Sequence, residues 1–229
     1  MNQIKVIIPA YNEQESIGKV IDDIPKIVSE IIVVNNNSTD NTKEVAIKHG
    51  ATVLDELNKG YGFACLKGME YISNQVEKPD IIVFLDGDYS DYPEQLIEII
   101  APIEKNNIDL VIGTRNTDER QKNSMTPQQV FGNWLATTLM RWFFKSTFTD
   151  LGPFRAIKYQ KLLDLNMVDK TYGWTVEMQL KALKQKLTYT EIPVKYRERI
   201  GTSKVSGTVK GSILAGYKIL SWIFKYSLK

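Results

Sequence analysis

A short apolar run that ends in acidic residues constrains the fold of this chain more than any other stretch. Residues 81–85 (IIVFL) have the length and β-branched content of a strand buried in a sheet. Asp86, Gly87 and Asp88 follow at once, and Asp91 comes shortly after. Open α/β sheets bind ligands outside the carboxyl ends of their strands, and carboxylates suit Mg²⁺ or Mn²⁺. The stretch alone is compatible with a ligand site and with an ordinary acidic turn.

The first half of the chain alternates between strand-like and helix-like segments. Strands are predicted at residues 4–8, 31–34, 53–54, 81–85 and 109–112, and helices at 12–26, 41–49, 64–73 and from residue 93 onward. This alternation predicts an α/β fold with a mostly parallel, Rossmann-like sheet flanked by helices. Polar clusters follow the predicted strands at residues 11–13, 35–40, 86–91 and 115. Their convergence at one edge of the sheet favours a ligand site over a set of unrelated turns.

The second half is less regular. Residues 116–129 are polar and aperiodic, and we expect either a lid over a site or an idle surface insertion. Residues 130–148 are rich in aromatic residues, as in one or two helices that lie in a core or on a membrane interface. Residues 150–155 are irregular, residues 175–186 are helical, and residues 188–194 alternate like an edge strand.

The C-terminal segment is basic and amphipathic. From residue 207 onward, a helical wheel places two sets on opposite faces: Lys210, Lys218, Ser221, Lys225 and Lys229 on one, and Ile213, Tyr217, Leu220, Ile223 and Phe224 on the other. A basic face beside an apolar face suits an anionic membrane surface. Docking on the chain's own domain or on a second subunit is the alternative.

Composition argues against several classes of function. The 229 residues carry a net charge of +2, which does not indicate a protein that binds nucleic acid. Cys65 is the only cysteine, so no intrachain disulfide can form and a reducing compartment is expected. His49 is the only histidine, which argues against a histidine-based zinc site and a Ser-His-Asp triad. We expect no signal peptide and no membrane-spanning helix, because no long uncharged apolar run occurs.

Several short motifs occur in an order that resembles a known enzyme family. They are PAYNE (9–13), VVNNNSTD (33–40), NKGYGFA (58–64), DGD (86–88), GTR (113–115), DLGPFR (150–155), EM (177–178), EIPV (191–194) and RIGTSK (199–204). The set is similar to the family 2 glycosyltransferases of GT-A fold, in particular the dolichyl-phosphate mannose synthases and other polyprenyl-phosphate glycosyltransferases. The resemblance implies a GT-A catalytic domain over residues 1–200 and a basic amphipathic helical tail over residues 201–229.

The resemblance also implies roles for individual residues. The nucleotide-sugar would bind Pro9, Tyr11, Glu13, Asn36, Asp40, Lys59, Gly60, Asp86 and Gly87. Asp86 and Asp88 match the family's Asp-x-Asp motif for Mg²⁺ or Mn²⁺, with Asp88 the stronger ligand. Asp91 is a further candidate ligand, and it could instead cap the helix that starts at Pro93. Asp88, Arg115 and Arg199 would carry catalysis, the arginines by gathering phosphate charge. The candidates for the acceptor site are Arg155, Glu177, Ser203 and Lys204, although Glu177 could instead position a basic partner from the face of a helix.

Four positions depart from the family pattern. Asn35 and Asn36 stand where the family usually has two acids, which leaves the nucleotide base open between uracil and guanine. Ser90 stands where the mannose synthases have a glutamine that helps to hold the metal, so Asp91 or water would replace it. Tyr61 stands where a lysine is frequent, with Lys59 displaced by two positions.

The resemblance implies an inverting, metal-dependent transferase that moves a sugar from a UDP- or GDP-sugar to a polyprenyl (dolichyl or undecaprenyl) phosphate. Such a phosphate is ionised near neutral pH and needs no strong base, whereas an alcohol would need one, with Asp91 or Glu177 as candidates. We expect a cytoplasmic, peripheral protein that contacts the membrane through residues 130–148 and the C-terminal helix. The sequence does not decide between a monomer and a homo-oligomer. The alternatives are a hydroxyl acceptor on a glycan or lipid, and a non-catalytic nucleotide-sugar binding protein.

Overall fold

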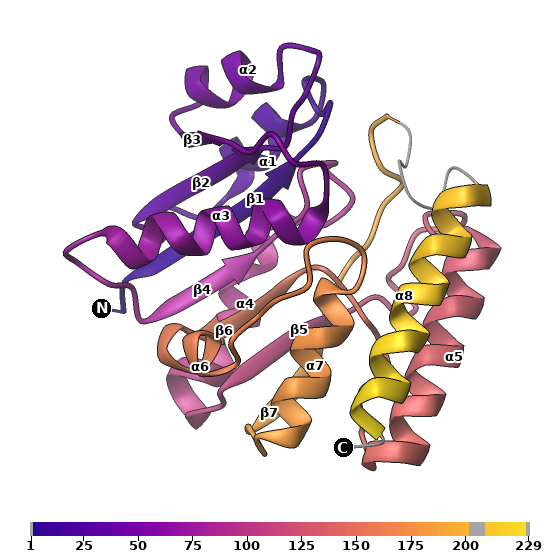
Figure 1. Cartoon of the computed structure of the whole chain (residues 1–229). Coiled ribbons are helices and arrows are strands. Elements are labelled where there is room, and N and C mark those ends of the chain that lie inside the picture. The colour runs from indigo at the N-terminus through magenta and orange to yellow at the C-terminus, as the bar shows by residue number, and fades with distance from the viewer. Residues whose placement is uncertain (1, 202–208, 228–229) are drawn as a thin grey trace.

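The computed structural model describes residues 2–201 and 209–227 (Figure 1). Within them, seven strands form one sheet: β1 (Ile4–Ala10), β2 (Glu30–Asn35), β3 (Thr52–Asp55), β4 (Ile81–Phe84), β5 (Leu110–Thr114), β6 (Arg155–Lys158) and β7 (Tyr189–Pro193). The helices are α1 (Ile17–Asp23), α2 (Thr42–Lys48), α3 (Tyr61–Asn74), the 3-10 helix η1 (Pro93–Gln95), α4 (Leu96–Asn106), α5 (Pro127–Phe144), α6 (Tyr159–Asp164), α7 (Trp174–Lys184) and α8 (Val209–Ser227).

The sheet has the strand order β3-β2-β1-β4-β6-β5-β7, and among these strands only β6 runs antiparallel to its neighbours. On the central strand, Ile7 pairs with Ile32 of β2 and with Phe84 of β4. This mostly parallel sheet confirms the α/β class predicted from the alternation of strands and helices, and β7 lies at the edge as expected. β6 was not predicted, because it is only four residues long and begins with a charged residue, Arg155.

Two apolar cores cover the two faces of the sheet. On one face, α1, α2 and α4 pack over side chains such as Val6 and Val83. On the other face, α3, α6 and α7 pack over side chains such as Ile7 and Phe84. Successive residues of a strand point to opposite faces, so a strand with helices on both sides must be apolar throughout. This requirement explains the unbroken apolar run of β4.

The edge formed by the strand ends gathers the polar clusters. β1, β2 and β4 run parallel, so the residues that follow Ala10, Asn35 and Phe84 meet at one edge of the sheet. β6 runs in the opposite direction between β4 and β5, so the segment before Arg155 reaches this same edge. The antiparallel strand therefore adds residues from the second half of the chain to a site that begins in the first half.

Helix α5 begins earlier than the sequence indicates. Thr126 and Gln129 form a capping box, in which each side chain accepts a hydrogen bond from the other residue's backbone N–H. Residues 127–129 are therefore helical instead of belonging to the expected loop, and α5 is one continuous helix. No helix in the described ranges is both long and apolar enough to cross a bilayer.

Helix α8 lies alongside α5 and also contacts α7 (Figure 1). Trp222 and Ile223 are buried in this contact, and Lys218 pairs with the buried Asp169 at 3.2 Å. Ile213 and Tyr217 are exposed instead. This corrects the helical wheel, because Ile223 from the expected apolar face and Lys218 from the expected basic face both contact the domain.

Gly68 of α3 provides a test of the helix–sheet packing. A Cβ atom at this position would lie 2.8 Å from Ile7 Cγ2. Overpacking a core costs about 1–3 kcal/mol, which outweighs the gain of about 1 kcal/mol from replacing a helical glycine by alanine. We expect Gly68→Ala to lower the free energy of unfolding, measured in urea, by up to about 2 kcal/mol.

Gly132 of α5 is the matched control for this substitution. A Cβ atom there would meet no heavy atom of the described chain within 4 Å. Gly132→Ala should therefore raise the free energy of unfolding by up to about 1 kcal/mol. Equal effects of the two substitutions would contradict the close contact between α3 and β1.

Candidate active site

Two adjoining cavities lie at the strand-end edge. The first, the strand-end cavity, has a volume of about 380 Å³ and is lined mainly by residues that follow β1, β2 and β4. The second, the helical cavity, has a volume of about 310 Å³ and includes residues of α5 and α8 in its walls. The two cavities have six lining residues in common, which are Tyr61, Asp86, Asp88, Thr171, Tyr172 and Arg199. Molecules bound in the two cavities would therefore meet at the acidic end of β4.

Asp88 is held in place from both sides. The backbone N–H and the hydroxyl of Ser90 donate hydrogen bonds to Asp88 Oδ1. Arg199 Nη1 lies 3.1 Å from Asp88 Oδ2, and Arg199 Nη2 donates to Glu13 Oε1 at 3.1 Å. The guanidinium of Arg199 thus lies between two carboxylates that line the strand-end cavity. Its position brings residue 199 to the end of β4, as the sequence motifs predict.

Asp86, unlike Asp88, has a buried oxygen without a hydrogen-bond partner among the described residues, and the pKa of Asp86 is raised. No hydrogen bond of normal geometry reaches its buried Oδ1 atom within the described chain. Burial, together with the negative charge of Asp88, raises the pKa of Asp86 to about 7, although Arg199 and Arg115 oppose this rise. A buried carboxyl with an unused oxygen is suited to bind a cation, because the cation would replace the missing hydrogen bonds.

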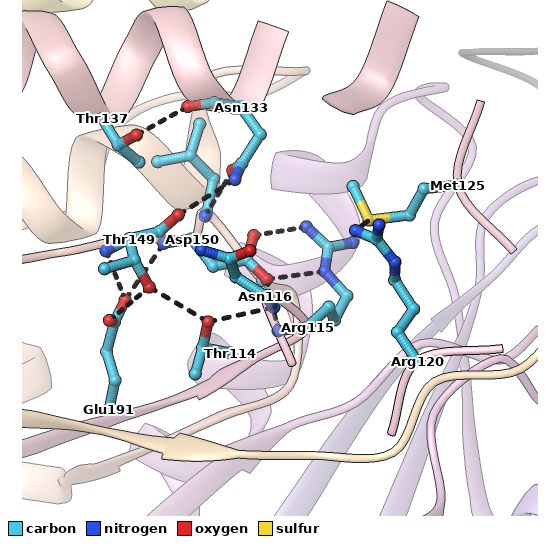
Figure 2. Close-up of polar contacts among 12 residues, drawn as sticks. Thr114, Arg115, Asn116, Arg120, Met125, Asn133, Thr137, Thr149, Asp150 and Glu191 are labelled. Carbon is cyan, nitrogen blue, oxygen red and sulfur yellow. Dashed lines mark hydrogen bonds and ion pairs between the residues drawn. The ribbon is translucent and has the colours of Figure 1, made fainter. Parts of the chain in front are cut away.

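Arg115 is fixed by a buried ion pair with Asp150 (Figure 2). Its Nε and Nη2 atoms donate to the two Asp150 oxygens at 2.9 and 2.7 Å, so the pair is bidentate. Burial by itself would lower the pKa of Arg115, but the charge and hydrogen bonds of Asp150 hold it well above its ordinary value. The guanidinium therefore stays charged, and its Nη1 atom is the nitrogen that Asp150 does not engage.

A further layer of polar contacts supports this ion pair (Figure 2). Glu191 of β7 accepts hydrogen bonds from the backbone N–H groups of Thr149 and Asp150 and from the Thr149 hydroxyl. Gln179 of α7 donates to the backbone carbonyl of Asp150. Asp150 and Glu191 belong to motifs noted in the sequence, but their link to Arg115 could not be predicted because it joins segments far apart in the chain.

The strand-end cavity contains most of the residues predicted to bind a nucleotide-sugar. Those that line it are Pro9, Tyr11, Glu13, Asn36, Lys59, Gly60, Asp86 and Gly87. Asp88 and Arg199, which were predicted to carry catalysis, line it as well. Asp40 lies outside this group. Its carboxylate accepts hydrogen bonds from the backbone N–H groups of Gln14 and Thr42, so it joins two loops behind the cavity. Ser203 and Lys204 fall outside the described residues.

Asn36 supports the glycine loop at residues 58–62. Its Oδ1 atom accepts from the Gly60 N–H at 2.8 Å, and its Nδ2 atom donates to the Asn58 carbonyl at 2.6 Å. Lys59, held between these two residues, donates from Nζ to the Tyr11 hydroxyl at 2.9 Å. An aspartate at position 36 could accept the Gly60 bond but could not donate to Asn58. The departure from the family pattern at this position therefore has a structural role.

Arg155 and Glu177 were candidates for the acceptor site, but neither of them lines either cavity. Arg155 is fully buried and donates to the backbone carbonyls of Leu151, Gly152 and Thr175, and burial lowers its pKa to about 10. Glu177 is also fully buried. It accepts from the backbone N–H groups of residues 168 and 169 and pairs with Lys181 at 2.8 Å. Both side chains hold the backbone behind the helical cavity.

Asp91 lines neither cavity and lies buried near the acidic pair. Both of its carboxyl oxygens lack a hydrogen-bond partner within the described chain. Burial and the charges of Asp86 and Asp88 hold its pKa well above its ordinary value. Tyr92, and not Asp91, is the N-cap residue of η1, and no side-chain cap bond forms there. The structure therefore does not give Asp91 the helix-cap role that the sequence left open.

The sequence also missed several residues that line the cavities. Thr171 and Tyr172 line both of them, and Tyr196 lines the helical cavity. Residues 171 and 172 lie in an aperiodic loop between α6 and α7, so no hydrophobic pattern or motif pointed to them. Tyr196 forms an isolated bridge with Asp91 after β7.

Comparisons with known proteins agree on one family. The model of the family "Glycosyl transferase family 2" matches residues 5–165. An uncharacterized glycosyltransferase of Mycobacterium tuberculosis is 33% identical over 220 residues, which cover 93% of this chain and 94% of the relative. The undecaprenyl-phosphate mannosyltransferase of Micrococcus luteus is 29% identical over 225 residues, which cover 91% and 90%.

Solved structures show the same fold. Glucosyl-3-phosphoglycerate synthase of Mycobacterium tuberculosis, crystallised with Mn²⁺, UDP and phosphoglyceric acid, superposes with a TM-score of 0.79 at 19% identity and covers 99% of this chain and 78% of its own. Another crystal of that enzyme contains Mg²⁺ and UDP. The similarity confirms the GT-A fold expected from the motifs.

Asp86 should make the stability of the cation-free protein depend on pH. Its pKa is higher in the folded state than in the unfolded chain, so the folded state binds more protons between pH 3.8 and about 7. Stability contributed by the protonated carboxyl is therefore lost as the pH rises through this window. We expect Asp86→Asn to raise the free energy of unfolding at pH 8 by on the order of 2 kcal/mol, and to have little effect at pH 4. Denaturant titrations at both pH values in EDTA test this, and an equal effect at the two would contradict it.

Proposed function

The chain belongs to glycosyl transferase family 2, and on this premise we propose that it transfers a sugar from a nucleotide-sugar to a polyprenyl phosphate at the cytoplasmic face of a membrane. The helical cavity is the observation that carries the proposal. Arg115 and Arg199 line it beside Asp88, and apolar side chains such as Leu151 and Ile219 form other parts of its wall. An acceptor with an anionic head and an apolar tail is complementary to both kinds of lining.

An exposed apolar surface next to this cavity supports a membrane-bound acceptor. This aromatic surface consists of Phe131, Trp134, Trp142 and Phe143 of α5 and Ile213, Leu214, Tyr217 and Phe224 of α8. The rings of Phe143 and Phe224 contact each other with centroids 5.8 Å apart, so the exposed apolar residues of the two helices meet there. Arg141, Lys145 and Lys225 are exposed on the same helices or directly after them. Aromatic residues interspersed with cations suit an interface with anionic lipids.

The strand-end cavity is proposed as the donor site. Tyr11 presents a ring with the Lys59 ammonium 4.7 Å from its centroid, which offers a platform and a positive charge for a nucleotide. Glu13 and the glycine loop line the same cavity. A further crystal of the solved synthase contains Mn²⁺ and UDP-glucose, a donor of this kind, and the shared fold supports the same use here.

The acidic pair fits a divalent cation such as Mg²⁺ or Mn²⁺. Mg²⁺ is often bound by one or two carboxylates together with substrate phosphates, so Asp86 and Asp88 suffice when a diphosphate is present. This agrees with the described residues, which include no cluster of three or more potential ligand side chains. When bound, the cation would supply positive charge that stabilises the departing diphosphate. Asp91 lies outside the cavity lining, so we propose Asp86 and Asp88 as the ligands.

The chain's own residues would then arrange a single in-line displacement. Arg115, held rigid by Asp150, and Arg199 would orient the acceptor phosphate toward the anomeric carbon. A phosphate oxygen would form the new bond while the bond to the nucleoside diphosphate breaks, which inverts the anomeric configuration. The acceptor oxygen is already ionised at neutral pH and no proton has to be removed. This explains how the site can work although Asp91 and Glu177, the bases considered for an alcohol, do not line it.

Turnover of the donor tests the assignment of the acidic pair. We expect Asp88→Asn to lower the release of nucleoside diphosphate by about 100-fold or more, and EDTA to have a similar effect on the wild type that Mg²⁺ or Mn²⁺ reverses. Asp164→Asn, at the end of α6, is the matched control and should keep full activity. Undiminished turnover by Asp88→Asn would contradict the metal site.

The acceptor is tested by mass spectrometry of products formed with a short polyprenyl phosphate, the corresponding polyprenol, and phosphoglycerate. We expect the sugar on the polyprenyl phosphate alone. Transfer to phosphoglycerate would show that the arginines bind a small phosphate without need of the apolar wall, and transfer to the polyprenol would point to a hydroxyl acceptor. Either result would overturn the lipid phosphate.

Membrane contact is tested by sedimentation with vesicles that contain anionic lipids. Trp142 is 74% exposed in the aromatic surface, and we expect Trp142→Ser to weaken binding about 5- to 30-fold through the loss of about 1–2 kcal/mol of buried apolar area. Val76 is 98% exposed outside this surface, so Val76→Ser is the matched control and should leave binding unchanged. Equal binding by both variants would contradict a bilayer contact through α5 and α8.

A further inference from the structure

The loop at residues 168–173, which we name the wall loop, is organised around one buried carboxylate. Asp169 Oδ1 accepts hydrogen bonds from the N–H groups of Thr171 and Gly173 at 2.7 and 3.0 Å. Asp169 Oδ2 accepts from Trp222 Nε1 at 2.6 Å and pairs with Lys218 Nζ at 3.2 Å. One oxygen thus shapes the wall loop, while the other binds two side chains of α8.

The wall loop also contacts the glycine loop on its other side. Phe63 N donates to the Lys170 carbonyl at 3.0 Å, and Gly62 N donates to the Thr171 carbonyl at 3.3 Å. A Cβ atom on Gly62 would lie 2.1 Å from the Asp169 carbonyl oxygen, so only glycine allows this approach. Because Thr171 and Tyr172 line both cavities, the wall loop forms part of the boundary of each.

Trp222 fits against this loop closely. Its side chain is buried, and a Cβ atom on Gly173 would lie only 2.5 Å from the indole ring. Lys218 lies one helical turn earlier on the same side of α8, so both donors reach Asp169 from one face of the helix. Ile213, Leu214, Tyr217 and Phe224 of α8 are exposed, whereas Lys218 and Trp222 fasten the helix to the wall loop.

We propose that Asp169 is a positioning residue that fastens helix α8 to the wall loop and thereby sets the shape of both cavities. The proposal rests on the proposed function for the identity of the ligands. Asp169 lines neither cavity. It acts through Thr171, Tyr172 and the glycine loop, so α8 serves the donor site as well as the acceptor site. A helix that only contacts lipid would not influence nucleotide binding in the absence of lipid.

The test uses two variants that each remove one donor to Asp169. Trp222→Phe keeps an aromatic ring but loses the N–H group, and Lys218→Met keeps the aliphatic stem but loses the charge. We expect each to raise the Kd for UDP with Mn²⁺ in calorimetry by about 3- to 10-fold without lipid. In turnover, KM for the donor should rise by a similar factor while kcat changes less than twofold.

Hydrogen exchange provides a readout that does not depend on the ligand. In both variants the amides of Thr171 and Gly173, and those of Gly62 and Phe63, should exchange faster. Trp142→Phe, on the exposed side of α5, is the matched control and should leave both segments unchanged. Faster exchange confined to α8 would overturn the proposal.

A double-mutant cycle separates the positioning role from a general loss of packing. Asp169→Asn can still accept hydrogen bonds from the wall loop through one oxygen, but its amide nitrogen cannot accept from Trp222. We expect Trp222→Phe to add less than a twofold change in Kd once Asp169→Asn is present, and additive effects would overturn the coupling. If wild-type protein binds neither UDP nor GDP, the proposed function fails, while the exchange experiment still decides the role of Asp169.

Discussion

The concentration of buried negative charge at the end of β4 is the constraint on which the rest of the site depends. Asp86, Asp88 and Asp91 lie within six residues, and burial raises the pKa of Asp86 and of Asp91. Arg199 and Arg115 balance part of this charge, and each needs support of its own. Arg115 is held by Asp150, whose backbone is held in turn from β7 and α7. The polar network of the second half therefore fixes Arg115 in the wall of the cavity that Asp86 and Asp88 also line.

The antiparallel strand explains how one site draws on both halves of the chain. The parallel strands place the nucleotide-side residues at one edge, as in other open α/β sheets. β6 then reverses direction and brings Asp150 to the same edge, opposite Arg115. The helices that follow β5 and β7 add an apolar wall beside this polar edge. Molecules in the two cavities can thus approach the acidic pair from different sides.

The sequence predicted what depends on local patterns. Apolar runs located β1, β2, β4 and β5, and the order of short motifs led to the family and to most residues of the strand-end cavity. It could not predict β6, because a buried arginine at its start hides the strand pattern. It also could not distinguish charged groups that face a cavity from those that hold backbone. Arg155 was therefore placed at the acceptor site, and Glu177 was left open between that site and the positioning of a basic residue, which in the structure is Lys181. The contacts of Asn36 and Asp169 could not be predicted either, because each side chain joins segments that are distant in the sequence.

The contact between Asp169 and Trp222 also bears on the order in which the protein matures during synthesis. The glycine loop and the wall loop meet through residues near positions 62 and 170, but the wall loop is fastened to α8 by residue 222. At roughly 5–20 residues per second, Trp222 is added some ten to thirty seconds after Gly62. The sheet can form during this interval, while the cavities acquire their final boundary only afterwards. A nascent chain would thus have its sheet folded before its two cavities are complete. The helix that completes them, α8, also carries part of the aromatic surface proposed to contact a bilayer.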